Sequence, residues 1–191
     1  MRGFHAIDFL HQFAQGVITP GACCVDATAG RGQDTLFLAQ LVGAQGKVLA
    51  FDIQAEAIHS TKQRLQQQDL LQRVELYLEN HIFLEQYIAL DRVDSIWFNF
   101  GYLPGGNHQI ATRPAESVLA IQKALPLLNP QGWLFLCVYQ GGDTGFAEKE
   151  AILSAVQSLD RRQYTVIYNE FINKPNFPPI PILIRKESSM L

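Results

Sequence analysis

Residues 26–35 read Asp-Ala-Thr-Ala-Gly-Arg-Gly-Gln-Asp-Thr. This glycine-rich segment follows a short apolar run, 22–27, and leads into a helical pattern over 33–42. The glycines at positions 30 and 32 let the backbone turn tightly and approach a ligand without a Cβ clash. Ligands of open α/β sheets bind beyond the carboxyl ends of the strands. The segment therefore predicts such a sheet, with a binding site at this turn.

The rest of the chain continues the alternation of strand-like and helical patterns. Further strands are expected over 47–53, 74–78, 93–100, 133–139, 164–172 and 181–186, and helices over 55–67, 82–89, 114–128 and 146–159. Such alternation is typical of a parallel sheet with helices on both faces, and two final strands joined only by a loop must pair antiparallel. We therefore predict the α/β class: a Rossmann-like, doubly wound, seven-stranded sheet, mostly parallel, with one antiparallel strand at its far end.

Length and composition indicate a globular protein. The 191 residues favour a single domain over 1–191, with residues 1–20 as a flanking helix or lid. Hydrophobic residues make up 48% of the chain and charged residues 17%, which excludes a disordered chain. The net charge of −3 comes without a basic tail, so binding to nucleic acid would depend on a local patch.

The cysteines, histidines and apolar runs exclude several other classes. Cys23, Cys24 and Cys137 lie in apolar runs and are odd in number, so they are expected to be core residues rather than a disulfide framework. The five histidines have no metal-ligand spacing, and no metal site is predicted. No apolar run reaches the roughly 18 residues of a membrane span, and the N-terminus does not resemble a secretory signal. We expect a cytoplasmic protein without membrane contact.

The first loop favours a nucleoside over a dinucleotide. A dinucleotide fingerprint would place a third glycine at position 35, where this chain has Thr35. Asp26 and Asp34 in the same loop would repel a pyrophosphate. A neutral or cationic nucleoside fits this loop better.

The end of the second expected strand carries the next candidate residue. Asp52 follows Gly30 by 22 residues, where a carboxylate accepts hydrogen bonds from both hydroxyls of a ribose. The alternative is that Asp52 only caps the next helix. Asn80 and His81, after the third strand, are placed to flank an adenine, although Asn80 is equally suited to capping a helix.

The fourth strand ends in Asn-Phe-Gly-Tyr-Leu-Pro, residues 99–104. The side-chain oxygen of Asn99 and the carbonyl of Phe100 can both accept hydrogen bonds from one –NH₂ group. An aromatic ring such as Tyr102 can stack on a base or face a cationic sulfonium. Such a site orients an amine lone pair toward an electrophilic methyl and catalyses by positioning. The alternative is an ordinary turn after a strand.

These motifs together resemble a known family. Residues 26–39 (DATAGRGQDTLFLA), 51–54 (FDIQ), 98–106 (FNFGYLPGG) and 171–179 (FINKPNFPP) are similar to the YtqB/MnmM-type methyltransferases, and the similarity extends from about residue 20 to 186. The resemblance implies a class I methyltransferase fold and S-adenosyl-L-methionine as the methyl donor. It also implies methylation of the aminomethyl group of a wobble uridine, with the tRNA anticodon region as partner.

The predicted site residues fall into two groups. The catalytic group is Asn99, Phe100 and Tyr102. The cofactor-binding group is Asp26, Thr28, Gly30, Gly32, Gln33, Asp34, Thr35, Asp52, Ile53, Gln54, Asn80, His81 and Asn99.

The chain departs from the family pattern at two positions. Gln33 stands where the family usually has a histidine, and residues 139–142 read Tyr-Gln-Gly-Gly in place of Tyr-x-Gly-His. These differences affect the prediction of how the acceptor substrate is placed or loses a proton. The predicted fold and cofactor hardly depend on them.

The predicted chemistry is an in-line attack of a neutral primary amine on a sulfonium methyl. A desolvated pocket would lower the pKa of that amine, and the sequence identifies no general base. The alternatives are methylation of a small molecule or of rRNA, and a nucleotide-binding scaffold without catalysis.

Basic and aromatic residues outside these motifs are candidates for contact with RNA or with a second copy of the chain. Arg31, Arg113, Lys174 and Arg185 are expected at the rim of the pocket to meet phosphates, with 173–179 as a wall for a splayed base. Oligomeric state is left open, since Phe4, Phe9 and Phe13 at helical spacing suit either a lid or a homodimer contact.

Overall fold

The computed structural model describes residues 3–89, 92–100 and 113–188, except for the side chains of 142–144. The strands are β1 (Cys23–Asp26), β2 (Lys47–Asp52), β3 (Val74–Leu78), β4 (Val93–Phe100), β5 (Leu128–Val138), β6 (Tyr164–Tyr168) and β7 (Ile180–Lys186). The α-helices are α1 (Ala6–Val17), α2 (Gln33–Leu41), α3 (Ala55–Gln66), α4 (Pro114–Ala124) and α5 (Gly142–Gln157). Short 3₁₀ helices are η1 (Leu71–Arg73), η2 (His81–Gln86) and η3 (Leu125–Leu127).

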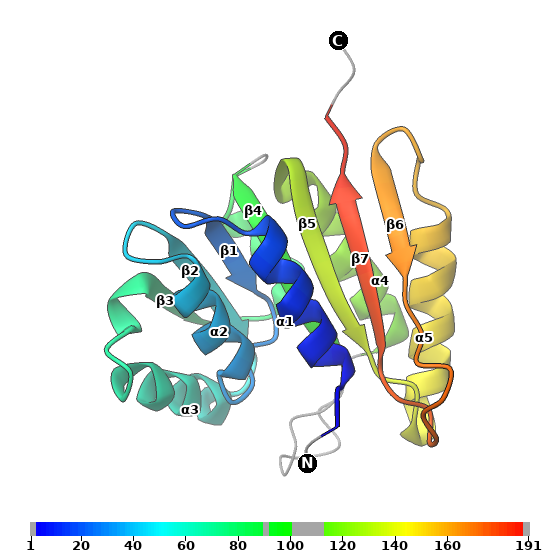
Figure 1. The fold of residues 1–191 in the computed structure, drawn as a ribbon, viewed down its shortest axis with the longest axis horizontal. Coiled ribbons are helices and arrows are strands. Elements are labelled where there is room, and N and C mark those ends of the chain that lie inside the picture. The colour runs from blue at the N-terminus through cyan, green and yellow to red at the C-terminus, as the bar shows by residue number, and fades with distance from the viewer. Residues whose placement is uncertain (1–2, 90–91, 101–112, 189–191) are drawn as a thin grey trace.

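The strands form one sheet in the order β3-β2-β1-β4-β5-β7-β6 (Figure 1). The pairings among β1 to β5 are parallel, and β7 runs antiparallel to both β5 and β6. The predicted class, a mostly parallel seven-stranded sheet, is confirmed. The antiparallel strand, however, lies one position inside the edge. Residues 180–184 of β7 are all buried, whereas β6 alternates exposed and half-buried side chains and therefore suits the edge.

The two faces of the sheet bury separate cores. Helices α1, α2 and α3 cover one face, over a core that includes Ala50, Trp97 and Cys137. Helices α4 and α5 with η2 cover the other, over a core that includes Phe98 and Phe100. Because successive strand residues point to opposite faces, neighbours such as Trp97 and Phe98 serve different cores. A parallel sheet covered on both sides needs such apolar strands.

Two predicted boundaries differ from the structure for local reasons. Residues 129–132, expected as a turn, lie within β5 as an irregular insertion, between the partners of Val93 and Ser95. Gln131 there has a φ of +69°, and a Cβ on Gly132 would lie 2.9 Å from the Asn129 carbonyl oxygen. The helix expected over 114–128 ends at Ala124, because a proline two residues later changes the chain to η3.

Helix α1 packs its aromatic side chains on the sheet. The ring of Phe13 lies edge-on to Trp133, with 4.9 Å between centroids, and Phe9 packs against the same core. Of the three phenylalanines suggested for a lid or a dimer contact, only Phe4 is well exposed, at 47%. The apolar face of α1 is therefore largely used within the chain.

Cys24 and Cys137 are buried, and burial raises the pKa of each thiol to about 12. Their predicted place in the core is confirmed. Among the helices of the described ranges, none is both long and apolar enough to cross a bilayer.

Candidate active site

The ends of β2 and β4 present their polar residues on one side of the sheet. Asp26 at the end of β1 pairs with Ala50 of β2 and with Trp97 of β4. Asp52 and Asn99 each lie two residues further along, so they are level with each other and about two interstrand spacings, roughly 10 Å, apart. Ala50 and Trp97 belong to the core under α1 and α2, so Asp52 and Asn99 face that same side. The strand order reverses between β1 and β4, which is where open α/β sheets bind ligands.

The glycine loop between β1 and α2 is pressed against α3. Gly30 and Gly32 have φ angles of +53° and +74°, in the left-handed region that favours glycine. A Cβ on Gly32 would lie 2.8 Å from the Cα of Thr61. The Thr61 hydroxyl donates a hydrogen bond of 3.1 Å to the Gly30 carbonyl. The loop thus has a fixed path that any side chain at position 32 would disturb, and Thr61 is a supporting residue that sequence reasoning missed.

Asp52 holds the glycine loop against the end of β2. Its Oδ2 accepts a 2.9 Å hydrogen bond from the Gly30 amide, and its Oδ1 accepts one of 2.9 Å from the Gln54 amide. Partial burial raises the pKa of this carboxyl, opposed by these amide bonds. Asp52 remains half-buried, and each carboxylate oxygen has capacity for another donor. Ile53, 51% exposed, adds apolar surface beside the carboxylate.

Asp26 lies beneath the loop. Its carboxylate accepts a 2.6 Å hydrogen bond from the Thr35 hydroxyl and one of 3.2 Å from the Thr28 amide. Burial, with the nearby charge of Asp34 adding to it, raises the pKa of Asp26 to about 7. Asp26 and Thr35 are at most 1% exposed, so the structure gives them a supporting position. Their predicted contact with a cofactor stays untested.

Asp34 connects α1 to the end of β4. Its Oδ1 lies 2.8 Å from Nε2 of His11, whose ring stacks on Phe37 at 3.8 Å between centroids. Its Oδ2 accepts a hydrogen bond of 3.4 Å from the Asn99 side-chain amide, and the Asn99 backbone amide donates to the Thr28 hydroxyl at 2.7 Å. Sequence reasoning assigned His11 no function, because nothing local shows that α1 packs over residue 34.

This arrangement fixes the orientation of the Asn99 side chain. A carboxylate only accepts hydrogen bonds, so the nitrogen of the Asn99 amide faces Asp34 and the oxygen faces away. That oxygen, Oδ1, is buried and has no hydrogen-bond partner in the described part of the chain. A buried acceptor without a donor is costly, so an incoming N–H group would bind there favourably. Phe100 is fully buried, and Tyr102 lies outside the described residues.

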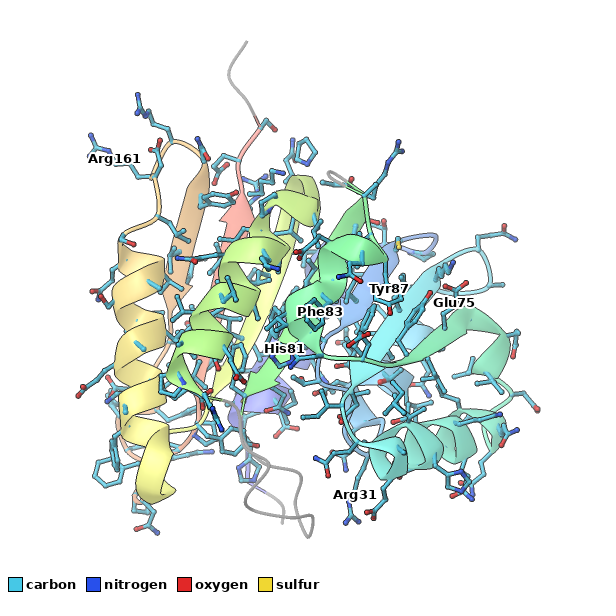
Figure 2. The ribbon with its side chains drawn as sticks, turned by 180° about the vertical axis from the view of Figure 1, so that it is seen from behind. Arg31, Glu75, His81, Phe83, Tyr87 and Arg161 are labelled. Carbon is cyan, nitrogen blue, oxygen red and sulfur yellow. The ribbon has the colours of Figure 1, made fainter. Side chains whose placement is uncertain are left out.

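Asn80 and His81 follow β3 at the same edge. Asn80 Oδ1 accepts a 3.0 Å hydrogen bond from the Ile82 amide, so this side chain caps η2, as the alternative interpretation held. Nδ1 of His81 donates to the Ala27 carbonyl at 3.2 Å. Burial lowers the pKa of His81 to about 4, so the ring is neutral at pH 7. Figure 2 labels His81 and, lower in the view, Arg31 of the glycine loop.

One of the four predicted rim cations is misplaced. Arg185 pairs with Trp133 across β7 and β5, at the opposite edge of the sheet, because β7 runs antiparallel and its last residues lie far from the carboxyl ends of the other strands. A cavity of about 430 Å³ lies there, and its charged groups bind protein atoms: Asp94 binds the Cys23 amide and Asn129, and Arg185 binds Glu187. That cavity is separate from the glycine loop.

Comparison with known proteins decides the family. Residues 48–185 match the family model described as "Putative rRNA methylase". The chain belongs to this rRNA methylase family. A structure from Clostridium thermocellum described in the same terms is 40% identical, with a TM-score of 0.92, and the match covers 97% of this chain and 100% of that one.

Two further relatives of the present chain carry more specific names. A Streptococcus mutans structure described as "a putative methyltransferase" in complex with SAH is 35% identical with a TM-score of 0.85, over 97% of this chain and 99% of that one. A chloroplastic tRNA (mnm(5)s(2)U34)-methyltransferase from Arabidopsis thaliana is 31% identical, over 96% of this chain and 70% of the relative. The predicted family and enzyme class, an S-adenosylmethionine-dependent methyltransferase, are confirmed.

Proposed function

We propose that this family member is an N-methyltransferase that uses S-adenosyl-L-methionine to methylate the aminomethyl group of 5-aminomethyl-(2-thio)uridine at the tRNA wobble position. The observation that carries the proposal is the buried, unpartnered Oδ1 of Asn99, on the same edge and face of the sheet as the Asp52 carboxylate. The name of the Arabidopsis relative supports the substrate, and the SAH complex of the Streptococcus relative supports the cofactor.

The residues at this edge fit an adenosyl cofactor. Asp52 would accept hydrogen bonds from the ribose hydroxyls, and the exposed side chain of Ile53 would lie against the adenine. The backbone of Gly30 and Gly32 would pass close to the cofactor, since the loop is held flat against Thr61. When bound, the cofactor supplies an electrophilic methyl group on a sulfonium. Gln33, Gln54, Asn80 and His81 complete the predicted wall.

Asn99 and Phe100 would orient the acceptor. The Asn99 oxygen and the Phe100 carbonyl would each accept one N–H of the primary amine, so that its lone pair points at the methyl group. A free alkylamine has a pKa near that of lysine and is protonated at neutral pH, so it must lose one proton to solvent on entering the site. After transfer the product nitrogen carries a positive charge and leaves as an ammonium. The proton balance of the methyl transfer therefore requires no general base in the pocket.

The test is methyl transfer from labelled S-adenosylmethionine to bulk tRNA that lacks the final wobble methyl. Label in the wobble nucleoside after digestion is expected, and transfer only to rRNA or to a small amine would contradict the proposal. Tight cofactor binding with no acceptor would support the scaffold alternative. Binding of the anticodon stem-loop should also weaken as salt rises, whereas turnover of a small molecule should change little.

The net charge of −3 favours the small-molecule alternative, so the salt experiment is the sharper discriminator. The cytoplasmic location and a homodimer stay predictions.

A further inference from the structure

The link between β6 and β7 belongs to the same edge of the sheet as Asn99. Across the strands, Asn99 is level with Cys137 of β5, which pairs with Pro181 of β7. β7 is therefore about two interstrand spacings, roughly 10 Å, from β4 at this level. The link, residues 169–179, joins the sheet here, as Figure 1 shows at the lower end of β6 and β7.

Hydrogen bonds from buried and half-buried side chains fix this link. The backbone and side-chain amides of Asn169 donate to the Pro181 carbonyl at 3.1 Å and 3.4 Å. Gln140, 8% exposed, donates to the Pro178 carbonyl at 2.8 Å. The link is thus held at both ends and by the loop that follows β5.

The link and the start of α5 carry exposed aromatic rings. Phe177 is 64% exposed and Phe146 is 42% exposed, and their rings lie edge-on, 5.4 Å between centroids. Asn176 and Phe177 both have positive φ angles, +61° and +49°. Two consecutive non-glycine residues with left-handed φ angles raise the conformational energy of the link. In the free protein this strained backbone holds the Phe177 ring toward solvent.

Lysines accompany these rings. The Lys149 ammonium lies 5.7 Å from the centroid of Phe146, and the Lys174 ammonium lies 4.6 Å from that of Phe171. Phe4 packs edge-on to Phe171 at 6.2 Å. We name these four phenylalanines and two lysines the aromatic ridge. Phe171 is half-buried, and the other three rings are exposed. Exposed rings with cations nearby suit nucleobases, which stack on the rings, and phosphates, which meet the ammonium groups.

We propose that the aromatic ridge binds unpaired nucleotides of the RNA substrate, next to the nucleotide whose base reaches Asn99. The inference rests on the proposed function, since it places the RNA around the same acceptor site. Bases inside a duplex are stacked on each other and cannot reach the rings, so the ridge selects a single-stranded loop. The nucleotides bound there are neighbours in sequence of the methylated one, because the ridge and Asn99 share one edge of the sheet.

The test compares affinities for a fluorescein-labelled anticodon stem-loop RNA and for a matched fully paired RNA. The double variant Phe146→Leu/Phe177→Leu keeps apolar bulk but removes both rings, and should weaken stem-loop binding by about tenfold or more. Phe177→Tyr keeps a ring and should bind normally. Lys174→Ala should reduce the slope of log Kd against log salt by about 0.7.

The chain offers a matched control in Phe83, which is 36% exposed and has the Lys123 ammonium 5.9 Å from its ring. Phe83 lies on η2, which packs against α4 on the sheet face away from Asp52, and is labelled in Figure 2. Phe83→Leu should leave RNA affinity unchanged. Equal losses in Phe83→Leu and the double variant would overturn the proposal, as would equal affinity of the wild type for loop and duplex.

Two outcomes separate this inference from the proposed function. If the wild type methylates tRNA but the double variant binds the stem-loop normally, the ridge proposal fails alone. If RNA binding depends on the ridge but no tRNA is methylated, the proposed function fails and the ridge stands. A change in sedimentation of the double variant with unchanged RNA affinity would make the ridge a contact between copies and overturn the proposal.

Discussion

The side-chain amide of Asn99 donates to the Asp34 carboxylate at 3.4 Å, although the two residues are 65 positions apart in the chain. Asp34 in turn is held by His11 of α1 at 2.8 Å. Because the carboxylate can only accept, it decides which end of the Asn99 amide is left for a ligand. Three segments, α1, the start of α2 and the end of β4, thereby set the orientation of one side-chain oxygen.

Asp34→Asn should lower the turnover number about five- to tenfold and leave the cofactor Kd unchanged. An amide at position 34 offers both a donor and an acceptor, so the Asn99 side chain no longer has one favoured orientation. The transition state then loses stabilisation equal to about one hydrogen bond. Stopped-flow or steady-state kinetics with saturating cofactor would measure the change. An unchanged turnover number with weakened cofactor binding would show instead that Asp34 contacts the cofactor.

Asn99→Ala should reduce turnover more strongly than Asp34→Asn, because it removes the acceptor itself. Cofactor affinity, measured by calorimetry, should be retained. Normal turnover in this variant would remove Asn99 from the amine-orienting role.

Asp52→Ala should weaken cofactor binding by at least roughly 1.5–3 kcal/mol, because each hydrogen bond from a ribose hydroxyl to this charged acceptor contributes about that much. The substitution also leaves the Gly30 and Gln54 amides without their acceptor, whereas Asp52→Asn keeps one oxygen and can retain one of these two bonds, so it is the milder test of the ribose contact. It should be destabilised less than Asp52→Ala and still bind the cofactor more weakly. Unchanged affinity in both variants, measured by calorimetry, would place the ribose elsewhere.

Gly32→Ala should destabilise the protein by roughly 1–3 kcal/mol and weaken cofactor binding. The left-handed φ of +74° and the 2.8 Å approach to the Thr61 Cα both oppose a Cβ. Gly16→Ala in α1 is the matched control, because nothing lies within 4 Å of its added Cβ and alanine favours a helix. Urea denaturation should therefore move the two variants in opposite directions, and parallel shifts would contradict the loop geometry.

The buried Asp26 should make stability depend on pH. Its folded pKa is raised to about 7 from 3.8, so the folded state binds more protons than the unfolded state between these values. Stability from this group is fully present below about pH 4 and is lost as pH rises through about 7. Asp26→Asn keeps an acceptor for the Thr28 amide, and the Thr35 hydroxyl can rotate to accept.

Thermal unfolding of both proteins between pH 4 and 8 would check this. The wild type should lose roughly 2 kcal/mol or more relative to Asp26→Asn across the range. Parallel curves would mean that Asp26 is ionised throughout.

Much of the fold could be predicted from local patterns. The strand over 93–100 and the helix that starts at Gln33 appear where expected, because continuous apolar runs and 3.6-residue periodicity reflect which side chains each element buries. The candidate site at the ends of the first four strands can also be predicted, since polar residues after apolar strands are visible in the sequence. The tight turn at Gly32 could be predicted from the sequence. The close approach of Thr61, which also excludes a side chain at position 32, could not.

The sequence by itself determined the alternation of elements, the class of sheet and the set of polar residues at the strand ends, because these depend on neighbours within one or two turns. Only the tertiary structure decided that β7 lies between β5 and β6, which sends Arg185 to the far edge, and that His11 and Asp34 orient Asn99. These relationships depend on strand order, direction and helix packing. The two contacts that orient Asn99 join residues 23 and 65 positions apart, and a contact over such separations leaves no periodic trace in the chain.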